Sequence, residues 1–278
     1  MANIKEYTVP PLPQVILQVI QYDHNSPTAN PQDIEKIVSP DKGISAEILK
    51  VANSAYYGRS GKVKLLRDAT SLLGLKALKN LIIFLGTKNL NEKIKTPILK
   101  KYVNTLPIVS ALLAKEIARD LKKENLVEEV FLAALLHKIG MSILAVNKSE
   151  HYALLLEECE KNEFDILEME RSSYGTDHME LGRQIAEMWK LPNELVRCCG
   201  IGTHTKVEEL QTDLEKITFI ASICSMELLH IPVEPSNYQK ANQVYQQLGG
   251  KGDVILKFAS EEVFNKIKEH PFYQLAVT

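Results

Sequence analysis

The chain has 278 residues, a length that is enough for one large domain or two modest ones, and its formal net charge is −2. Its 45% hydrophobic and 24% charged residues exclude a disordered or fibrous chain. The longest aliphatic stretch, Leu81 to Leu85, is too short to cross a bilayer, and Met1 to Pro11 lacks the apolar core of a secretory signal. Four cysteines, two of them adjacent, do not make a disulfide framework, so we expect a cytoplasmic protein.

Basic residues are concentrated in one part of the sequence. Between Arg59 and Lys101 there are 11 Lys and Arg residues against only Asp68 and Glu92, a net charge of +9. Such a segment can bind an anionic partner such as nucleic acid, or it can be a solvated face that keeps the protein soluble. The solvated face is the favoured interpretation, and nucleic-acid binding is the alternative.

The N-terminal third predicts a series of short helices. Apolar residues recur every three or four positions between residues 15 and 20. Asn30 followed by Pro31 is typical of a helix start, because Asn caps a helix and Pro suits its first position. Further helices are predicted over residues 44–52, 68–73 and 75–85, with Gly74 separating the last two.

A polar stretch over residues 89–97 separates this part from a second helical part. A long helical pattern runs from Leu99 to Ile117, in which Pro107 is expected to introduce a kink. A weaker connection over residues 232–253 precedes a last helix, Val254 to Ile267. The intervening helical patterns show no strand-like alternation, so the predicted fold is all-α; they cover 127–139, 152–159, 166–171, 178–189, 193–199 and 214–229.

Three histidines are candidate metal ligands. His137 ends an apolar helix, His178 begins another, and His204 follows a glycine-containing loop. A neutral imidazole can bind Zn, Fe, Ni or Mn, but a divalent site normally includes carboxylates, and His137 is followed by Lys138. A core or capping histidine is therefore the favoured interpretation of His137, and a metal site is the alternative.

Three motifs together resemble the HDOD family, helical domains of bacterial signalling proteins that are related to the HD phosphohydrolases. The segment from Leu49 to Gly58 reads LKVANSAYYG, close to the family's Leu-x-x-Ala-Asn-Ser-Ala-Tyr-Tyr-Gly motif. Pro10 to Pro13 and Leu72 to Lys76 match two further motifs of the family in the same order. The resemblance covers about residues 8–230.

The resemblance implies an HDOD-like division of the chain. An N-terminal helical part, about residues 8–95, is expected to pack on a degenerate HD-like helical part, about 96–230, and residues 231–278 are expected to form a helical extension. We expect the two halves to depend on one another for folding. The motif turn is expected to stabilise the join between them, and a binding role for its tyrosines is less favoured; it comprises Asn53, Ser54, Tyr56, Tyr57 and Gly58.

HD enzymes hold their metal with a histidine, a His-Asp pair and a late aspartate. By the resemblance, these positions fall on Asn104, on His137 with Lys138, and on Ser222. His178 and His204 fall where relatives with a second metal have further histidines. Metal-activated water is the nucleophile in such enzymes, and these positions lack the acidic metal ligands, so the resemblance implies neither catalysis nor a cofactor. It also implies that Lys138 is buried and hydrogen-bonded in place of an ion.

The expected function is non-catalytic regulation in bacterial signal transduction. The chain would act in trans in the cytoplasm, away from the membrane, by binding a signalling protein or a small ligand. One alternative is a metal-dependent nucleotide phosphodiesterase or phosphohydrolase of the HD type, with its metal held by the three histidines. The other is a nucleic-acid-binding regulator that uses the basic segment 59–101.

Overall fold

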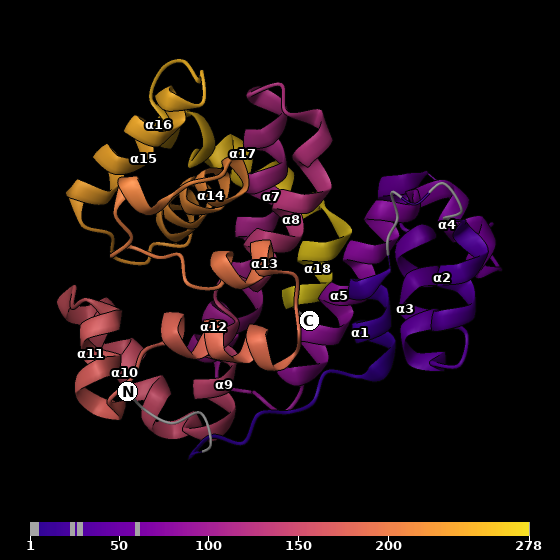
Figure 1. Ribbon diagram of the computed structural model, residues 1–278, viewed down its shortest axis with the longest axis horizontal. Helices are drawn as coiled ribbons and strands as arrows, with labels where there is room; N and C mark the ends of the chain where they lie inside the picture. The colour runs from indigo at the N-terminus through magenta and orange to yellow at the C-terminus, as the bar shows by residue number, and fades with distance from the viewer. Residues whose placement is uncertain (1–5, 23–25, 27–29, 59–61, 278) are drawn as a thin grey trace.

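The computed structural model describes residues 6–22, 26, 30–58 and 62–277, and within these ranges the chain forms helices and no strand. The all-α prediction is therefore confirmed. The first part of the chain packs together at one end of the molecule (Figure 1). It consists of α1 (Gln14–Gln21), α2 (Pro31–Val38), α3 (Lys42–Ala52), the short turn η2 (Ala55–Tyr57), α4 (Leu66–Leu73) and α5 (Leu75–Leu90).

The second part forms the middle and the other end of the molecule (Figure 1). It comprises α6 (Pro97–Lys100), η3 (Lys101–Thr105), α7 (Leu106–Asp120), η4 (Glu124–Leu126), α8 (Val127–Leu136), α9 (Ile139–Asn147), α10 (Ser149–Asn162), α11 (Ile166–Tyr174), α12 (His178–Met188), α13 (Asn193–Cys198), η5 (Val207–Glu209) and α14 (Asp213–Leu228). The chain ends with α15 (Pro235–Gln247), α16 (Val254–Phe258), α17 (Glu261–Glu269) and α18 (Pro271–Val277).

Local sequence signals explain two of the helix boundaries. The side chain of Asn30 accepts a hydrogen bond from the main-chain nitrogen of Asp33 at 3.1 Å, and Pro31 occupies the first turn of α2. Gly74 has a φ of 80°, a conformation that favours glycine, and α5 leaves α4 there at an angle of 113°. Both features agree with the expectations from the sequence.

A kink was expected at Pro107, and the structure has the π-helical turn η3 directly before the first turn of α7, which contains this proline. Proline has no N–H, so the carbonyl of Val103, four residues earlier, has no helical donor. The side chain of Asn91 donates to this carbonyl at 3.1 Å and to Oδ1 of Asn104 at 3.0 Å. The connection that follows α5 thereby fixes the irregular turn.

The most apolar stretch of the described chain lies at the centre of the fold. The run Glu124–Asn147 has a mean hydropathy of 1.7 and is long enough to cross a membrane by length and composition alone. In the structure, 89% of the apolar 18-residue stretch within this run is buried inside the molecule, as is usual for a core helix. The run contains α8 and α9, and the break between them carries His137 and Lys138.

The C-terminal helix joins the two halves of the chain. The ring of Phe272 in α18 stacks on Phe84 of α5 and meets Phe131 of α8 edge-on, with both centroid distances 5.7 Å. Figure 1 shows α18 between these helices. The segment after residue 230 was predicted as an extension, and its last helix is part of the shared hydrophobic core.

Candidate functional site

His137 and Ser222 are brought together in the core, although 85 residues separate them in sequence. His137 is fully buried, and its Nδ1–H donates to the carbonyl of Ala134 at 2.6 Å. Because Nδ1 carries the proton, Nε2 accepts a hydrogen bond from the Ser222 hydroxyl at 3.0 Å. Burial, followed by the neighbouring Lys138 ammonium, holds the pKa of His137 well below its usual range.

Lys138 directly follows His137 and has a different environment. The residue is only 5% exposed, as expected, but its ammonium has no hydrogen-bond partner among the described residues. The structure thus shows the expected burial of Lys138 but not the expected hydrogen bonds to the described residues. Burial lowers the pKa of Lys138 to about 8, against the opposing attraction of Glu170 and Asp165.

His178 is positioned by a buried glutamate. Asp177 caps α12 by accepting hydrogen bonds from the main chain of its first turn, which places His178 at the first helical position. The Glu170 carboxylate accepts from the main-chain nitrogen of His178 at 2.8 Å, from its Nδ1–H at 2.7 Å, and from the Tyr152 hydroxyl at 2.5 Å. The other ring nitrogen, Nε2, is buried without a partner among the described residues.

Two glycines allow the helices that carry Lys138 and His178 to come together. Gly140 lies in the first turn of α9 and faces Gly182 of α12. A Cβ at Gly140 would lie 2.0 Å from the carbonyl oxygen of His178 and 2.8 Å from the nitrogen of Gly182. Only glycine permits this backbone approach, which holds His178 beside the break between α8 and α9.

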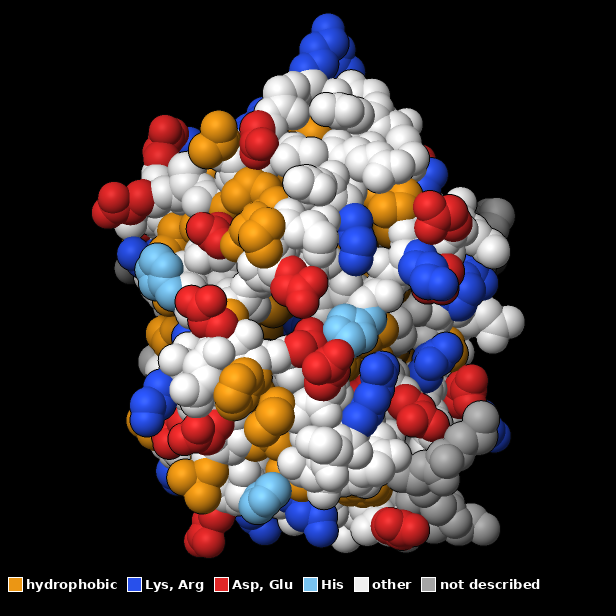
Figure 2. Space-filling model, turned by 90° about the vertical axis from the view of Figure 1, so that its left-hand side faces the viewer, with side chains coloured by type: hydrophobic (Ala, Val, Ile, Leu, Met, Phe, Trp, Pro, Cys, Tyr) orange, Lys and Arg blue, Asp and Glu red, His pale blue; other side chains and the backbone are white. Residues whose placement is uncertain are grey.

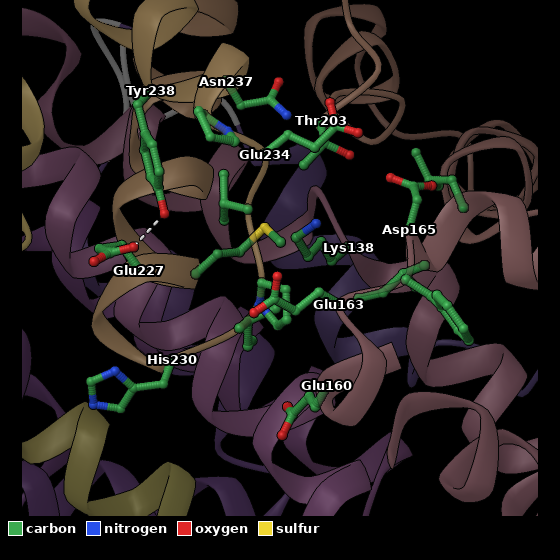
Figure 3. Close-up of a pocket in the computed structure, with 18 of the residues that line it drawn as sticks. Lys138, Glu160, Glu163, Asp165, Thr203, Glu227, His230, Glu234, Asn237 and Tyr238 are labelled. Atoms are coloured by element: carbon green, nitrogen blue, oxygen red, sulfur yellow. Dashed lines mark hydrogen bonds between the residues drawn. The ribbon is translucent and has the colours of Figure 1, made fainter. Parts of the chain in front are cut away.

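Lys138 and His178 both line a pocket of about 490 Å³. Its walls come from the connections between α10 and α11 and between α14 and α15. Lys138 lies at the centre of the labelled lining residues in Figure 3. Figure 2 shows acidic side chains around a hollow in the middle of this face. The acidic residues of the lining form what we call the acidic rim: Glu160, Glu163, Asp165, Glu227 and Glu234.

Asn104 and His204 lie at the margins of this arrangement. Asn104 is held by Asn91 and, with Lys138, borders a second cavity of only about 10 Å³. His204 is not in the lining of the larger pocket, but its Nε2 is 3.0 Å from the carboxylate of Asp165, which is. The six HD-type positions therefore form three pairs. His137 and Ser222 are buried and hydrogen-bonded to each other, Lys138 and His178 line the pocket, and Asn104 and His204 are peripheral.

These residues do not fit a divalent metal. Both ring nitrogens of His137 are already hydrogen-bonded, the position after it is an ammonium, and the late position is a hydroxyl. In the part of the chain that the structure describes, no group of three or more His, Cys, Asp or Glu side chains is arranged to hold an ion. A divalent cation at this position would face Lys138 without carboxylate ligands.

The motif turn is fixed mainly by Asn53. Its Nδ2 donates to the carbonyls of Leu49 at 2.9 Å and Val63 at 2.7 Å, and its Oδ1 accepts from the nitrogen of Val63 at 2.9 Å. The two bonds to Val63 tie the end of α3 to the chain that enters α4. Gly58 ends the turn with a φ of 61°, in the left-handed region.

The tyrosines of the turn face the C-terminal helices. Tyr56 is 56% exposed, and its ring lies 4.8 Å from that of His270. Tyr57 is partly buried, and both tyrosines border a cavity of about 560 Å³ shared with α7 and α17. The hydroxyl of Ser54 is buried without a partner among the described residues.

The basic segment 59–101 is spread through the fold. Its first residues, 59–61, lie outside the described ranges. Lys79 is buried and donates to main-chain carbonyls at the end of α1, at 2.9 and 3.1 Å. Lys76 and Lys101 form ion pairs of 3.0 and 2.7 Å with glutamates of the second half. These internal pairings reduce the positive charge that the segment presents to an anionic partner.

Glu170 and the acidic rim were not predicted from the sequence. Glu170 is fully buried and lies three residues after Leu167 on the inner face of α11. A glutamate on the apolar stripe of an amphipathic helix was the available signal. The rim residues come from two segments, 160–165 and 227–234, and no local sequence pattern links one segment to the other.

Comparison with known proteins places the chain in a family. The HDOD domain matches residues 9–204. An uncharacterised protein of Treponema pallidum (strain Nichols) is 25% identical over 190 residues, and the match spans 68% of this chain and 36% of that protein's length. An HDOD domain protein of unknown function from Geobacter sulfurreducens has a TM-score of 0.76 at 20% identity, covering 98% of this chain and 94% of its own.

Two further solved structures share the fold. A protein of Shewanella amazonensis SB2B, named as a proposed phosphohydrolase, has a TM-score of 0.72 at 23% identity and covers 99% of this chain and 96% of its own. A protein of Marinobacter aquaeolei VT8, named as a proposed signal transduction protein, has a TM-score of 0.69 at 21% identity, covering 97% and 59%. With the family match extending over more than half of its length, the chain belongs to the HDOD domain family.

Proposed function

We propose that this HDOD protein is a non-catalytic component of signal transduction that acts by binding. The observation that carries the proposal is the environment of His137. Its Nε2 lone pair, the group that would bind a metal, accepts a hydrogen bond from Ser222, and the buried ammonium of Lys138 follows directly. Hydrolysis of the HD type depends on metal-activated water, and these residues do not supply the ligands for it.

Binding is supported by the pocket on the other side of the same segment. A cavity of about 490 Å³ is within the size range of small-molecule sites and is lined by the buried Lys138 and His178. A regulatory protein needs a site whose occupation changes its surface, and this pocket lies between the ends of four helices. Residues from the ends of α10 and α14 and the starts of α11 and α15 form its walls.

The test is a measurement of bound metal combined with an assay of hydrolysis. The full chain would be incubated with Mn²⁺, desalted and subjected to elemental analysis, and then assayed with a generic phosphodiester. We expect no stoichiometric metal and no turnover. One tightly bound metal per chain, together with hydrolysis that is lost in His137→Ala, would overturn the proposal. The double variant Lys138→Asp/Ser222→Asp restores two carboxylates and serves as the comparison for metal uptake.

A further inference from the structure

We infer that the pocket lined by Lys138 and His178 binds a small zwitterion, a molecule with a carboxylate or another oxyanion at one end and an ammonium group at the other. The inference deepens the proposed function and rests on it, because it takes the pocket to be a binding site and not a catalytic one. Two unpartnered polar groups at the inner wall and the charge of the rim carry the argument.

Lys138 requires an acceptor. Its ammonium is a donor only, the residue is 5% exposed, and Nζ forms no hydrogen bond with the described residues although it is not one of the fully enclosed unpaired atoms, which leaves it open to the pocket. Polar groups that leave water are normally hydrogen-bonded, so an ammonium that the chain itself does not pair and that lines a cavity is available to an acceptor in that cavity. An oxyanion offers several acceptor sites to one ammonium.

His178 requires a donor. Glu170 accepts the Nδ1–H of His178, and Nε2 has no partner among the described residues; in the Nδ1–H tautomer Nε2 is an acceptor. The residue is 3% exposed and lines the same pocket as Lys138. A ligand that gives an acceptor to Lys138 and an N–H to His178 satisfies both groups, and an amino group close to a carboxylate has this combination.

The acidic rim sets the charge of the other end of the ligand. Glu160 is paired with Lys101, Asp165 with His204, and Glu227 accepts from Tyr238. Glu163 and Glu234 form no ion pair among the described residues, and both line the same pocket as Lys138 (Figure 3). A simple anion would be repelled by this rim, and a simple cation would be opposed by Lys138. A zwitterion is attracted by both.

The experiment is a calorimetric titration of the metal-free full chain with matched probes. The zwitterions are the twenty amino acids, 4-aminobutyrate and phosphoethanolamine, which separate carboxylate from phosphate sources and vary the spacing of the charges. Acetate and ethylamine carry one charge each, and glycine betaine has no N–H. We expect at least one zwitterion to bind and all three of these controls to fail. Binding of acetate or ethylamine alone, or of no probe at all, would overturn the inference.

Variants of the pocket sharpen the result. Lys138→Met is expected to weaken binding of the identified zwitterion by about thirtyfold or more, because it leaves a buried oxyanion unpaired. Glu163→Gln is expected to weaken binding by about threefold, since the rim is solvated. Lys251→Met, at an exposed lysine outside the lining, is the matched control. Unchanged binding in both pocket variants would contradict the inference.

Elemental analysis of the same sample separates the two proposals. A chain that retains stoichiometric metal contradicts the proposed function whatever its ligands. A chain without metal that binds none of the zwitterions contradicts only the inference drawn from the pocket.

Discussion

Two neighbouring residues, His137 and Lys138, illustrate two ways in which a buried polar group can be accommodated. His137 has a partner for each ring nitrogen, within its own helix and on α14, and its lowered pKa keeps it neutral at physiological pH. Lys138 has no hydrogen-bond partner among the described residues and lines a cavity. A satisfied buried group contributes to stability, whereas an unsatisfied one reduces stability and is available to a ligand.

The comparison shows that one short break between two helices serves two purposes. His137, the first residue of the break, is part of the core, and Lys138, the second, is part of the pocket lining. Replacing the side chain of His137 should therefore lower the free energy of unfolding, and replacing that of Lys138 should raise it.

The largest effect is expected from His137→Ala. The change removes a fully buried imidazole, opens a cavity and leaves the Ser222 hydroxyl without its acceptor, so we expect a loss of about 4 kcal/mol in the free energy of unfolding. Denaturant unfolding measures it, with the exposed His151→Ala as the control. A loss no greater than that of the control would show that the pair with Ser222 does not stabilise the core.

Gly140→Ala tests how the two helices bring the pocket residues together. A Cβ at this position meets main-chain atoms of α12 that cannot move aside, so we expect a loss of about 3 kcal/mol. Gly43→Ala is the control, since its nearest contact would be an ordinary 3.4 Å and alanine favours a helix. Equal effects in thermal unfolding would mean that α9 and α12 are not in close contact.

The motif turn offers a third comparison, between a bonded and an exposed side chain. Asn53→Ala removes one hydrogen bond within α3 and two that join the end of α3 to Val63, and we expect a loss of about 2 kcal/mol. Tyr56→Ala, at a side chain that is 56% exposed, is expected to cost less than about 1 kcal/mol. The reverse order in denaturant unfolding would assign the stabilising role to the tyrosine.

Much of the fold could be predicted from the sequence, because helix periodicity and caps are local. The cap at Asn30 and the break at Gly74 each depend on neighbours within four residues, and both are present. The place of α18 was not predicted, since Phe272 meets partners almost 190 and about 140 residues away. Contacts of that range leave no local pattern.

The candidate site was predictable only in part. The motif resemblance selected His137, Lys138 and Ser222, and the structure brings His137 and Ser222 into contact. The structure does not show the expected hydrogen bonds of Lys138 to the described residues, because whether a buried ammonium has acceptors depends on how far apart separate helices end. The acidic rim was missed for the same reason.

The central claim is that the Lys138 ammonium lowers the free energy of unfolding of the protein, and Lys138→Met tests it most directly. We expect this variant to raise the free energy of unfolding by about 1 kcal/mol at pH 7, since a desolvated charge is replaced by an apolar side chain. The folded-state pKa of Lys138 is about 8, against 10.5 as the ordinary value. Between these pH values the unfolded chain holds a proton that the folded chain has released, so wild-type stability rises relative to the variant and the advantage of methionine fades.

The measurement is the difference in unfolding free energy between wild type and Lys138→Met, from denaturant titrations at pH 7 and at pH 10. We expect a more stable variant at pH 7 and a smaller difference between the two proteins at pH 10. A variant that is less stable than wild type by several kcal/mol at pH 7 would contradict it, because Lys138 would then be a structural residue with partners in the folded protein.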